Sequence, residues 1–146
     1  MARGYPDFFS MPTFPSKGPF SQWSGGITIE PGADFTELFA INAKGTIYGG
    51  YLKSEDADLD LESHLRLTID EAPTPLRTLT DLFNRSKGEG FYHPLKVFNY
   101  STNPPVFYIA LRPDIDFGVN YKIEIDNPGI ANVTWVHEFY YSWVRG

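Results

Sequence analysis

The sequence of 146 residues contains no cysteine and no long apolar run. The absence of cysteine excludes a disulfide scaffold, a thiolate nucleophile and a cysteine metal site. No apolar stretch approaches the length needed to cross a bilayer, and the N-terminus lacks the apolar core of a signal peptide, so we expect a protein that is made and used in a cytoplasm, with no membrane partner. Clusters of Lys and Arg are also missing and the net charge is −6, so nucleic acid is not an expected partner either.

Aromatic residues and turn-forming residues are abundant instead. Aromatic side chains make up 16% of the chain, and there are 13 glycines and 12 prolines. This balance favours strands and turns over helices. The length is that of one domain with a core large enough to fold unaided.

Two runs near the C-terminus carry the clearest strand pattern. Apolar and polar residues alternate through residues 117–126, and residues 130–144 place Val133, Trp135, Phe139 and other large side chains on one face. Between the runs lies an Asn-Pro-Gly turn, residues 127–129. We therefore expect a long antiparallel hairpin whose aromatic face is covered by another sheet.

Residues 1–26 have neither strand nor helix periodicity. Four prolines interrupt the segment, which excludes a helix and favours an extended arm, with the β-sandwich body at residues 27–146. Large aromatic side chains left in water forfeit roughly 1.5 to 3 kcal/mol of transfer free energy each, so the arm needs a surface to bind. The predicted partner-binding residues are its six large aromatics, Tyr5, Phe8, Phe9, Phe14, Phe20 and Trp23.

The surface that the arm covers is open to two interpretations. The arm either wraps its own domain as a lid or clasps a neighbouring subunit. A disordered tail would be poor in aromatics, so the composition favours the clasp. Fully extended, the arm reaches at most about 80 Å, which is enough to cross a partner protein.

The middle of the chain predicts further strands and one helix. Thr74 can cap that helix, Pro75 suits its first position, and it should end near Ser86 and plug one end of the body. The paired glycines Gly49 and Gly50 predict a bulge or close backbone packing in their strand, since no phosphate-loop sequence follows them. The fold class is all-β, an antiparallel β-sandwich or flattened barrel of the jelly-roll type with one short helix and an extended N-terminal arm. The additional strands are expected at residues 27–30, 34–43, 46–53, 64–70, 91–100 and 106–112.

Residues that commonly carry chemistry are not arranged for it. The acids of residues 55–62 begin like a calcium loop, but the glycine and the final glutamate of such a loop are absent, so a solvated acidic loop is the favoured interpretation, with calcium left open. The histidines, His64, His93 and His137, show no metal-ligand spacing, and His137 is expected to pack in an aromatic face. We predict no catalytic residues, no metal and no cofactor, so the protein is not expected to be an enzyme.

The layout of the chain resembles a known class of virion proteins. An aromatic and proline-rich leader that begins ARGYPDFF (residues 2–9), a β domain that begins around KGTIYGG (residues 44–50) and a terminal strand with FYY (residues 139–141) are similar to auxiliary, or decoration, proteins of thermophilic tailed bacteriophages. The resemblance implies a trimer on the capsid exterior, bound through its N-terminal arm to the major capsid protein and to neighbouring copies. It also implies a non-catalytic, structural and thermostable protein that is assembled in the host cytoplasm.

Three other functions remain open at the level of the sequence. One is a tail, neck or baseplate component of the same kind of particle. Another is a carbohydrate-binding module, because β-sandwiches with exposed Trp and Tyr stack well on sugars. The third is a hydrolase built on two carboxylates, which would require two buried acids in a deep pocket.

Overall fold

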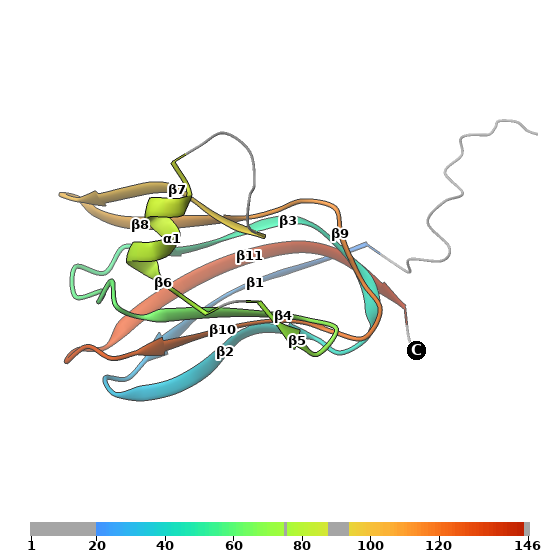
Figure 1. The fold of residues 1–146 in the computed structure, drawn as a ribbon, viewed down its shortest axis with the longest axis horizontal. Coiled ribbons are helices and arrows are strands. Elements are labelled where there is room, and N and C mark those ends of the chain that lie inside the picture. The colour runs from blue at the N-terminus through green and yellow to red at the C-terminus, as the bar shows by residue number, and fades with distance from the viewer. Residues whose placement is uncertain (1–19, 75, 88–93, 145–146) are drawn as a thin grey trace, which may run out of the picture.

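The computed structural model describes residues 20–74, 76–87 and 94–144. These residues form two antiparallel sheets that pack face to face, with one short helix beside them (Figure 1). The architecture confirms the antiparallel β-sandwich with one helix that the strand spacing predicts. No helix in the described part of the chain is long and apolar enough to cross a membrane.

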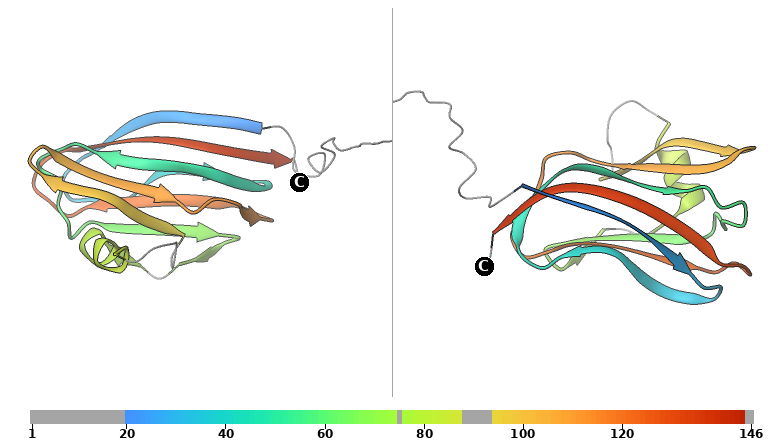
Figure 2. Two further views of the ribbon diagram at one scale, coloured as in Figure 1. Left: turned by 90° about the horizontal axis from the view of Figure 1, so that it is seen from above. Right: turned by 180° about the vertical axis from the view of Figure 1, so that it is seen from behind.

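The larger sheet has six strands in the order β1-β11-β3-β8-β7, with β9 paired to β3 beside β8. Strand β1 lies at one rim of this sheet and β7 at the other (Figure 2). The strands are β1 (Phe20–Ile29), β3 (Lys44–Ser54), β7 (Leu95–Thr102), β8 (Pro105–Leu111), β9 (Ile115–Phe117) and β11 (Val133–Val144).

The smaller sheet has the order β2-β10-β4-β5, with β6 also paired to β4. Its central strand β10 alternates between buried and half-buried residues along its whole length, as a strand with one dry face does. The strands are β2 (Ala33–Ile41), β4 (His64–Ile69), β5 (Ala72–Pro73), β6 (Arg77–Thr78) and β10 (Tyr121–Asn127).

The core lies between the two sheets and is rich in aromatic rings. Phe139 of β11 meets Phe39 of β2 with 4.0 Å between ring centroids, and Trp135 and Tyr121 are almost fully buried nearby. Burial raises the pKa of the Tyr121 hydroxyl, which has no hydrogen-bond partner among the described residues. The face of residues 130–144 that we predicted to be dry is therefore the core face.

The predicted C-terminal hairpin is wrong, because β10 and β11 belong to different sheets. Their apolar faces meet across the sandwich instead of lying side by side. The connection between them is held by Asn127, whose side-chain amide donates to the carbonyls of Ile29 (3.0 Å) and Ala131 (2.9 Å) and whose Oδ1 accepts from the Gly129 N–H. Alternation reports which face of a strand is dry, but it does not report which sheet the strand joins.

The predicted strand over residues 117–126 is also divided between the sheets. Oδ1 of Asp70 accepts the backbone N–H groups of Gly118 (2.8 Å), Val119 (2.7 Å) and Asn120 (3.3 Å), which fixes the bend between β9 and β10. The bond from Val119 is the main reason that the pKa of Asp70 is lowered; loss of solvent around the carboxylate opposes it, and the bonds from Gly118 and Asn120 add to it. Asp70 itself has a positive φ of 54°.

Strand β1 begins at Phe20, whereas we expected the body to begin at residue 27. The last proline of the leader is Pro19, and from Phe20 to Ile29 each residue has a register partner on β11. Serines and glycines in this stretch hide the apolar alternation that identifies a strand in a sequence. Residues 20–26, which we assigned to the arm, therefore belong to a strand of the sandwich.

The helix α1 (Leu79–Arg85) begins later than predicted and ends where predicted. Thr78 is its N-cap and accepts from the Asp81 N–H at 3.1 Å, while Thr74 bonds to the Leu67 carbonyl instead; Pro75 lies outside the described residues. The C-cap is Ser86. The helix contacts β6 and β7, so it covers the gap between the two sheets at that edge (Figure 1).

The paired glycines were predicted to mark a bulge or close backbone packing, and β3 has both next to them. Tyr140 pairs with Gly49 and Tyr141 pairs with Ile47, so Tyr48 is the extra residue of a bulge. Gly49 and Gly50 have positive φ, 156° and 148°. A Cβ on Gly50 would collide with the Glu138 carbonyl oxygen. The close approach of β11 to β3 therefore requires glycine at residue 50.

Candidate binding surface

The structure brings two of the six predicted partner-binding residues into β1. Phe20 is 66% exposed and Trp23 is 44% exposed, which is unusual for large aromatics in a strand. Because their positions differ by an odd number, they lie on opposite faces of the sheet rim. The other four, Tyr5, Phe8, Phe9 and Phe14, lie outside the described residues.

Phe20 lies on the outer face of the six-stranded sheet. Its ring stacks near Tyr48 of β3 and Tyr140 of β11, with centroid distances of 5.9 and 6.4 Å and interplanar angles of 27° and 19°. The Tyr48 hydroxyl is 3.2 Å from the Ser142 hydroxyl, the register partner of Phe20. Phe20 is thus held in place by its neighbours while most of its ring remains available to another molecule.

Trp23 lies on the inner face, at the open side between the sheets. Its ring meets Phe39 edge-on at 5.6 Å between centroids. Beside it is a shallow, mainly apolar pocket of about 270 Å³. The pocket is lined by Trp23, Ala40, Ile41, Asn42, Ala43, Tyr141 and Trp143.

Glu138 is the polar centre of the outer face. Its carboxylate accepts from the Tyr140 hydroxyl (2.6 Å), the Gln22 side-chain amide (2.7 Å) and the Ser24 hydroxyl (3.2 Å). The bond from Tyr140 is the main reason that the pKa of Glu138 is lowered; partial burial opposes it, and the bonds from Ser24 and Gln22 add to it. The same bond raises the pKa of Tyr140. A carboxylate with a lowered pKa and three donors is suited to holding β1 against β11 and is poorly suited to act as a base.

A second pair of tyrosines continues the outer face toward β8. The rings of Tyr51 and Tyr108 are nearly parallel, with 5.2 Å between centroids and 15° between planes. Burial raises the pKa of Tyr108, and Tyr51 and Glu138 raise it further. Flat rings beside hydrogen-bonding groups can bind either a protein or a sugar.

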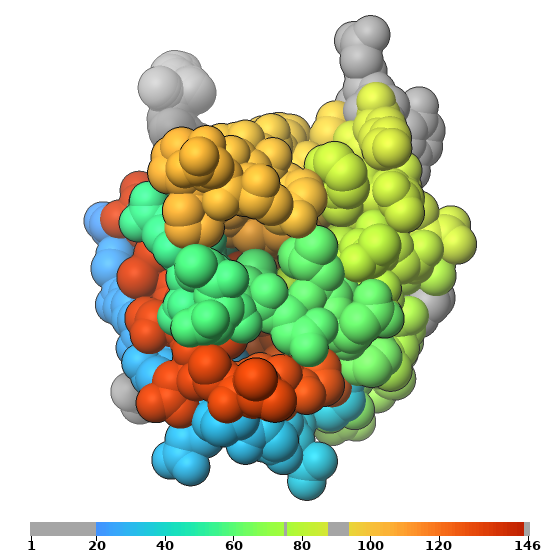
Figure 3. All heavy atoms as spheres, turned by 90° about the vertical axis from the view of Figure 1, so that its left-hand side faces the viewer, coloured from blue at the N-terminus to red at the C-terminus, as the bar shows by residue number. Residues whose placement is uncertain are grey.

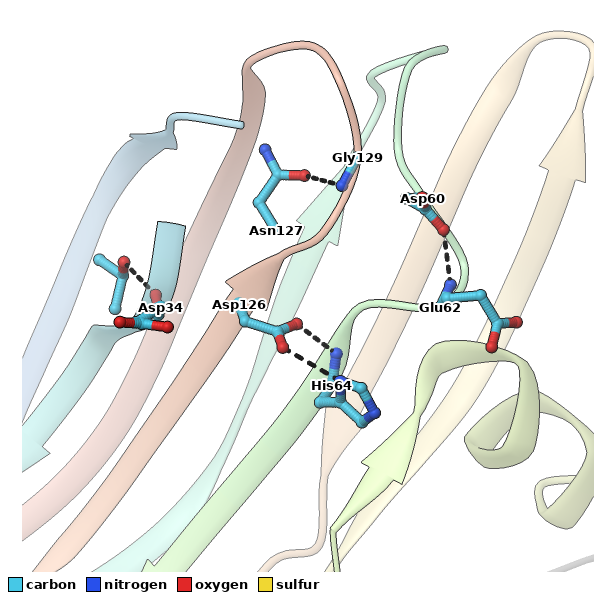
Figure 4. A network of polar contacts seen from close by, with 8 residues as sticks. Asp34, Asp60, Glu62, His64, Asp126, Asn127 and Gly129 are labelled. Atoms are coloured by element: carbon cyan, nitrogen blue, oxygen red, sulfur yellow. Dashed lines mark hydrogen bonds and ion pairs between the residues drawn. The ribbon is translucent and has the colours of Figure 1, made fainter. Parts of the chain in front are cut away.

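Two carboxylates of the acidic loop, those of Asp56 and Asp60, accept backbone hydrogen bonds in turns. Oδ1 of Asp56 accepts from the Asp58 N–H at 3.0 Å, and Oδ1 of Asp60 accepts from the Glu62 N–H at 2.8 Å (Figure 4). The loop lies between the β7–β8 turn and the connection after β10 (Figure 3). A pocket of about 160 Å³ opens between the loop and the β7–β8 turn. No group of three His, Asp or Glu residues within the described ranges could hold a metal ion.

The described histidines have structural surroundings. His64 Nδ1 lies 3.0 Å from Asp126 Oδ2, and the other oxygen of that carboxylate accepts the His64 backbone N–H (Figure 4). His137 is buried and stacks on Phe139 at 5.2 Å, as its position in the aromatic face predicted, and burial lowers its pKa. His93 lies outside the described residues. Every carboxylate in the described ranges is half-buried or exposed, so the buried pair that a hydrolase requires is not found there.

No family model matches the chain, and no curated protein matches it. The molecule is thus a β-sandwich protein with an aromatic first strand at one rim. Its function has to be argued from its own geometry.

Sequence reasoning missed the tyrosines of the outer face and the role of Glu138. The alternation of residues 130–144 did place Glu138 on the wet face, and the same alternation places Tyr140 beside it. The aromatic Tyr140 on a solvent-facing side was the sequence signal for a binding surface. The sequence could not assign Tyr48, Tyr51 and Tyr108 to the same surface, because that assignment requires the strand order.

Proposed function

We propose that the protein is a structural, non-catalytic protein that binds and stabilises the outside of a phage capsid through its N-terminal end. The observation that carries the proposal is the exposure of Phe20 and Trp23 at the start of the first strand, where the aromatic residues 1–19 join the body. The capsid in particular is suggested by the resemblance of the sequence layout. The partners are the major capsid protein and neighbouring copies.

The proposed mechanism is linkage between binding and lattice stability. A protein that binds the assembled lattice and not its free subunits stabilises the lattice by mass action. Aromatic side chains that enter fitted pockets supply most of the energy of such interfaces. Many copies, each with an aromatic N-terminal segment, multiply the effect.

The chemistry of the described residues supports a binding role. Asp56 and Asp60 of the acidic loop accept turn hydrogen bonds, and Glu138 accepts three hydrogen bonds. Phe20 is positioned by stacking, which lowers the entropy cost of burying it in a partner. A rigid aromatic with one free face is typical of an interface anchor.

Deletion of residues 1–19 tests the proposal, because it removes the N-terminal segment and leaves β1 complete. We expect the truncated protein to keep its circular dichroism spectrum and to lose co-sedimentation with purified capsids of the encoding phage. In the full chain, Phe20→Ala should weaken binding, while Phe98→Ala should not, although Phe98 is also mostly exposed (57%) and lies on the opposite rim. Undiminished occupancy by the truncated protein would remove the proposal.

A tail, neck or baseplate position is distinguished by labelling. Electron microscopy of particles with a tagged chain should show label over the whole head. Label at one vertex or along the tail would move the proposal to that part of the particle and reject the capsid surface.

A sugar-binding function is the second candidate, and the stacked pair Tyr51 and Tyr108 favours it. This function predicts micromolar to millimolar glycan binding by the body, independent of residues 1–19. A glycan array followed by titration of tryptophan fluorescence tests it. Loss of binding in Tyr108→Ala and retention in the deletion would support it, and no binding to any glycan would reject it.

A further inference from the structure

Strand β1 has one open edge. It is the first strand in the order of the six-stranded sheet, and one of its two edges pairs with β11 (Figure 2). No other described strand pairs with it. The middle of the strand, residues 22–26, consists of exposed residues only. A strand with an unpaired edge is a template for a strand from another molecule.

The other sheet edges carry features that normally prevent such pairing. β7 has Lys96 and a bulge between Val97 and Asn99, and β2 has Asp34 and Glu37. The pairing of β2 with β10 also has two register shifts. β5, β6 and β9 have only two or three residues each. Charges, bulges and short strands are the usual protection of an edge.

Strand β1 has none of these features. Its ten residues, FSQWSGGITI, include no charge and no proline, and its register with β11 is unbroken from Phe20 to Ile29. Its centre consists of Ser24, Gly25 and Gly26; one small side chain and two glycines leave the backbone accessible. The chain carries a net charge of −6, so an uncharged edge is the part that two copies can bring together without direct repulsion.

We propose that β1 pairs with β1 of a second copy, so that the two larger sheets become one continuous sheet. Within a second copy, β1 is the strand that can pair with this edge, because the other long edge strands, β7 and β2, are protected. Residues 1–19 are a poor alternative, because four prolines interrupt them. A surface that pairs with itself does so about a two-fold axis, which makes the strands antiparallel and the assembly a dimer.

The antiparallel arrangement also separates the two N-terminal ends. Phe20 of the two copies would lie at opposite ends of the paired strands, about 30 Å apart at the usual rise per residue. A dimer could then engage two neighbouring sites on a lattice, which raises avidity. The inference does not rest on the proposed function, and it differs from the trimer that the resemblance implies.

The mass of the full chain in solution is the first test. We expect light scattering to give twice the 16.5 kDa of one chain. Ser24→Lys places the side chain that natural edges use for protection at the middle of β1, and the mass should fall about twofold. Ser101→Lys on the opposite rim is the matched control and should remain a dimer. A single-chain mass for the wild type at all concentrations, or the mass of a trimer, would overturn the proposal.

Cysteine cross-linking provides a second test that does not depend on a disruptive substitution. The chain has no cysteine, so Ser24→Cys introduces a single thiol. With oxidised glutathione as oxidant, Ser24→Cys should form a disulfide-linked dimer, while Ser101→Cys should remain a monomer on a denaturing gel. Equal cross-linking at the two positions, or none at Ser24→Cys, would overturn the pairing of β1 with β1.

Discussion

The two edge strands of the six-stranded sheet, β7 and β1, differ in charge, in regularity and in burial. β7 carries a lysine and a bulge, and helix α1 packs against it. β1 is longer, has no charge and, among the described strands, pairs only with β11. The rims also differ in anchoring, since Leu95 and Val97 of β7 are buried, whereas Ile29 is the one residue of β1 that is buried. The β7 rim is built to remain part of one molecule, and the β1 rim is built to meet another.

The largest predicted effect comes from the difference in anchoring. Leu95→Ala removes a buried side chain from the β7 rim and should cost about 2–5 kcal/mol in the free energy of unfolding. Ile27→Ala removes a half-buried side chain from the β1 rim and should cost clearly less, because less apolar surface is exposed and no closed cavity forms. Urea denaturation measures both values. Equal losses of unfolding free energy in the two variants would contradict the claim that β7 is more deeply buried than β1.

A smaller loss of stability is predicted for changes at the contact between β3 and β11, the strand that carries β1. Gly50→Ala adds a Cβ that collides with the Glu138 carbonyl at a positive φ, and it should cost about 1–3 kcal/mol. Gly49→Ala has a similar φ but meets no atom within 4 Å, so it separates backbone strain from the collision. We expect the Gly50 variant to be the less stable in urea denaturation. If Gly49→Ala proved equally unstable, strain alone would explain the glycines.

The smallest effect is a pH dependence confined to the β1 rim. His137 lies beneath Gly25, and burial lowers its pKa below its ordinary value of 6.5. The unfolded chain therefore binds a proton before the folded chain does, so this contribution to stability is complete above pH 6.5 and falls as the pH drops below it. His137→Phe keeps a ring on Phe139 and should flatten the stability profile between pH 7 and 5. An unchanged slope would show that His137 does not cause it.

The sequence predicted the parts of the fold that depend on one strand at a time. The dry face of β11, the bulge beside Gly49 and the end of α1 near Ser86 follow from local alternation, glycine conformation and capping. The pairing of β10 and β11 could not be predicted in this way, because adjacent strands with complementary apolar faces can lie side by side or face to face. Here the side chain of Asn127 holds the crossing between the sheets.

Competing local signals explain the remaining errors. Thr74 followed by Pro75 and Thr78 followed by Asp81 both match a helix start. The backbone and side chain of Thr74 donate to the Leu67 carbonyl, so Thr74 does not cap the helix and Thr78 does. Phe20 and Trp23 were assigned to an arm, but they lie in β1; their role in binding a partner stays a prediction. Their place at an open rim depends on the strand order, which local patterns do not report.

Amide hydrogen exchange tests the central claim most directly, because it compares the two rims in one sample. If β1 pairs with a second copy, amides of residues 20–29 should exchange more slowly as the protein concentration rises, while those of residues 95–102 should not change. Ser24→Lys should abolish the concentration dependence. Exchange in β1 that is the same at every concentration, in the wild type and in the variant, would contradict the account.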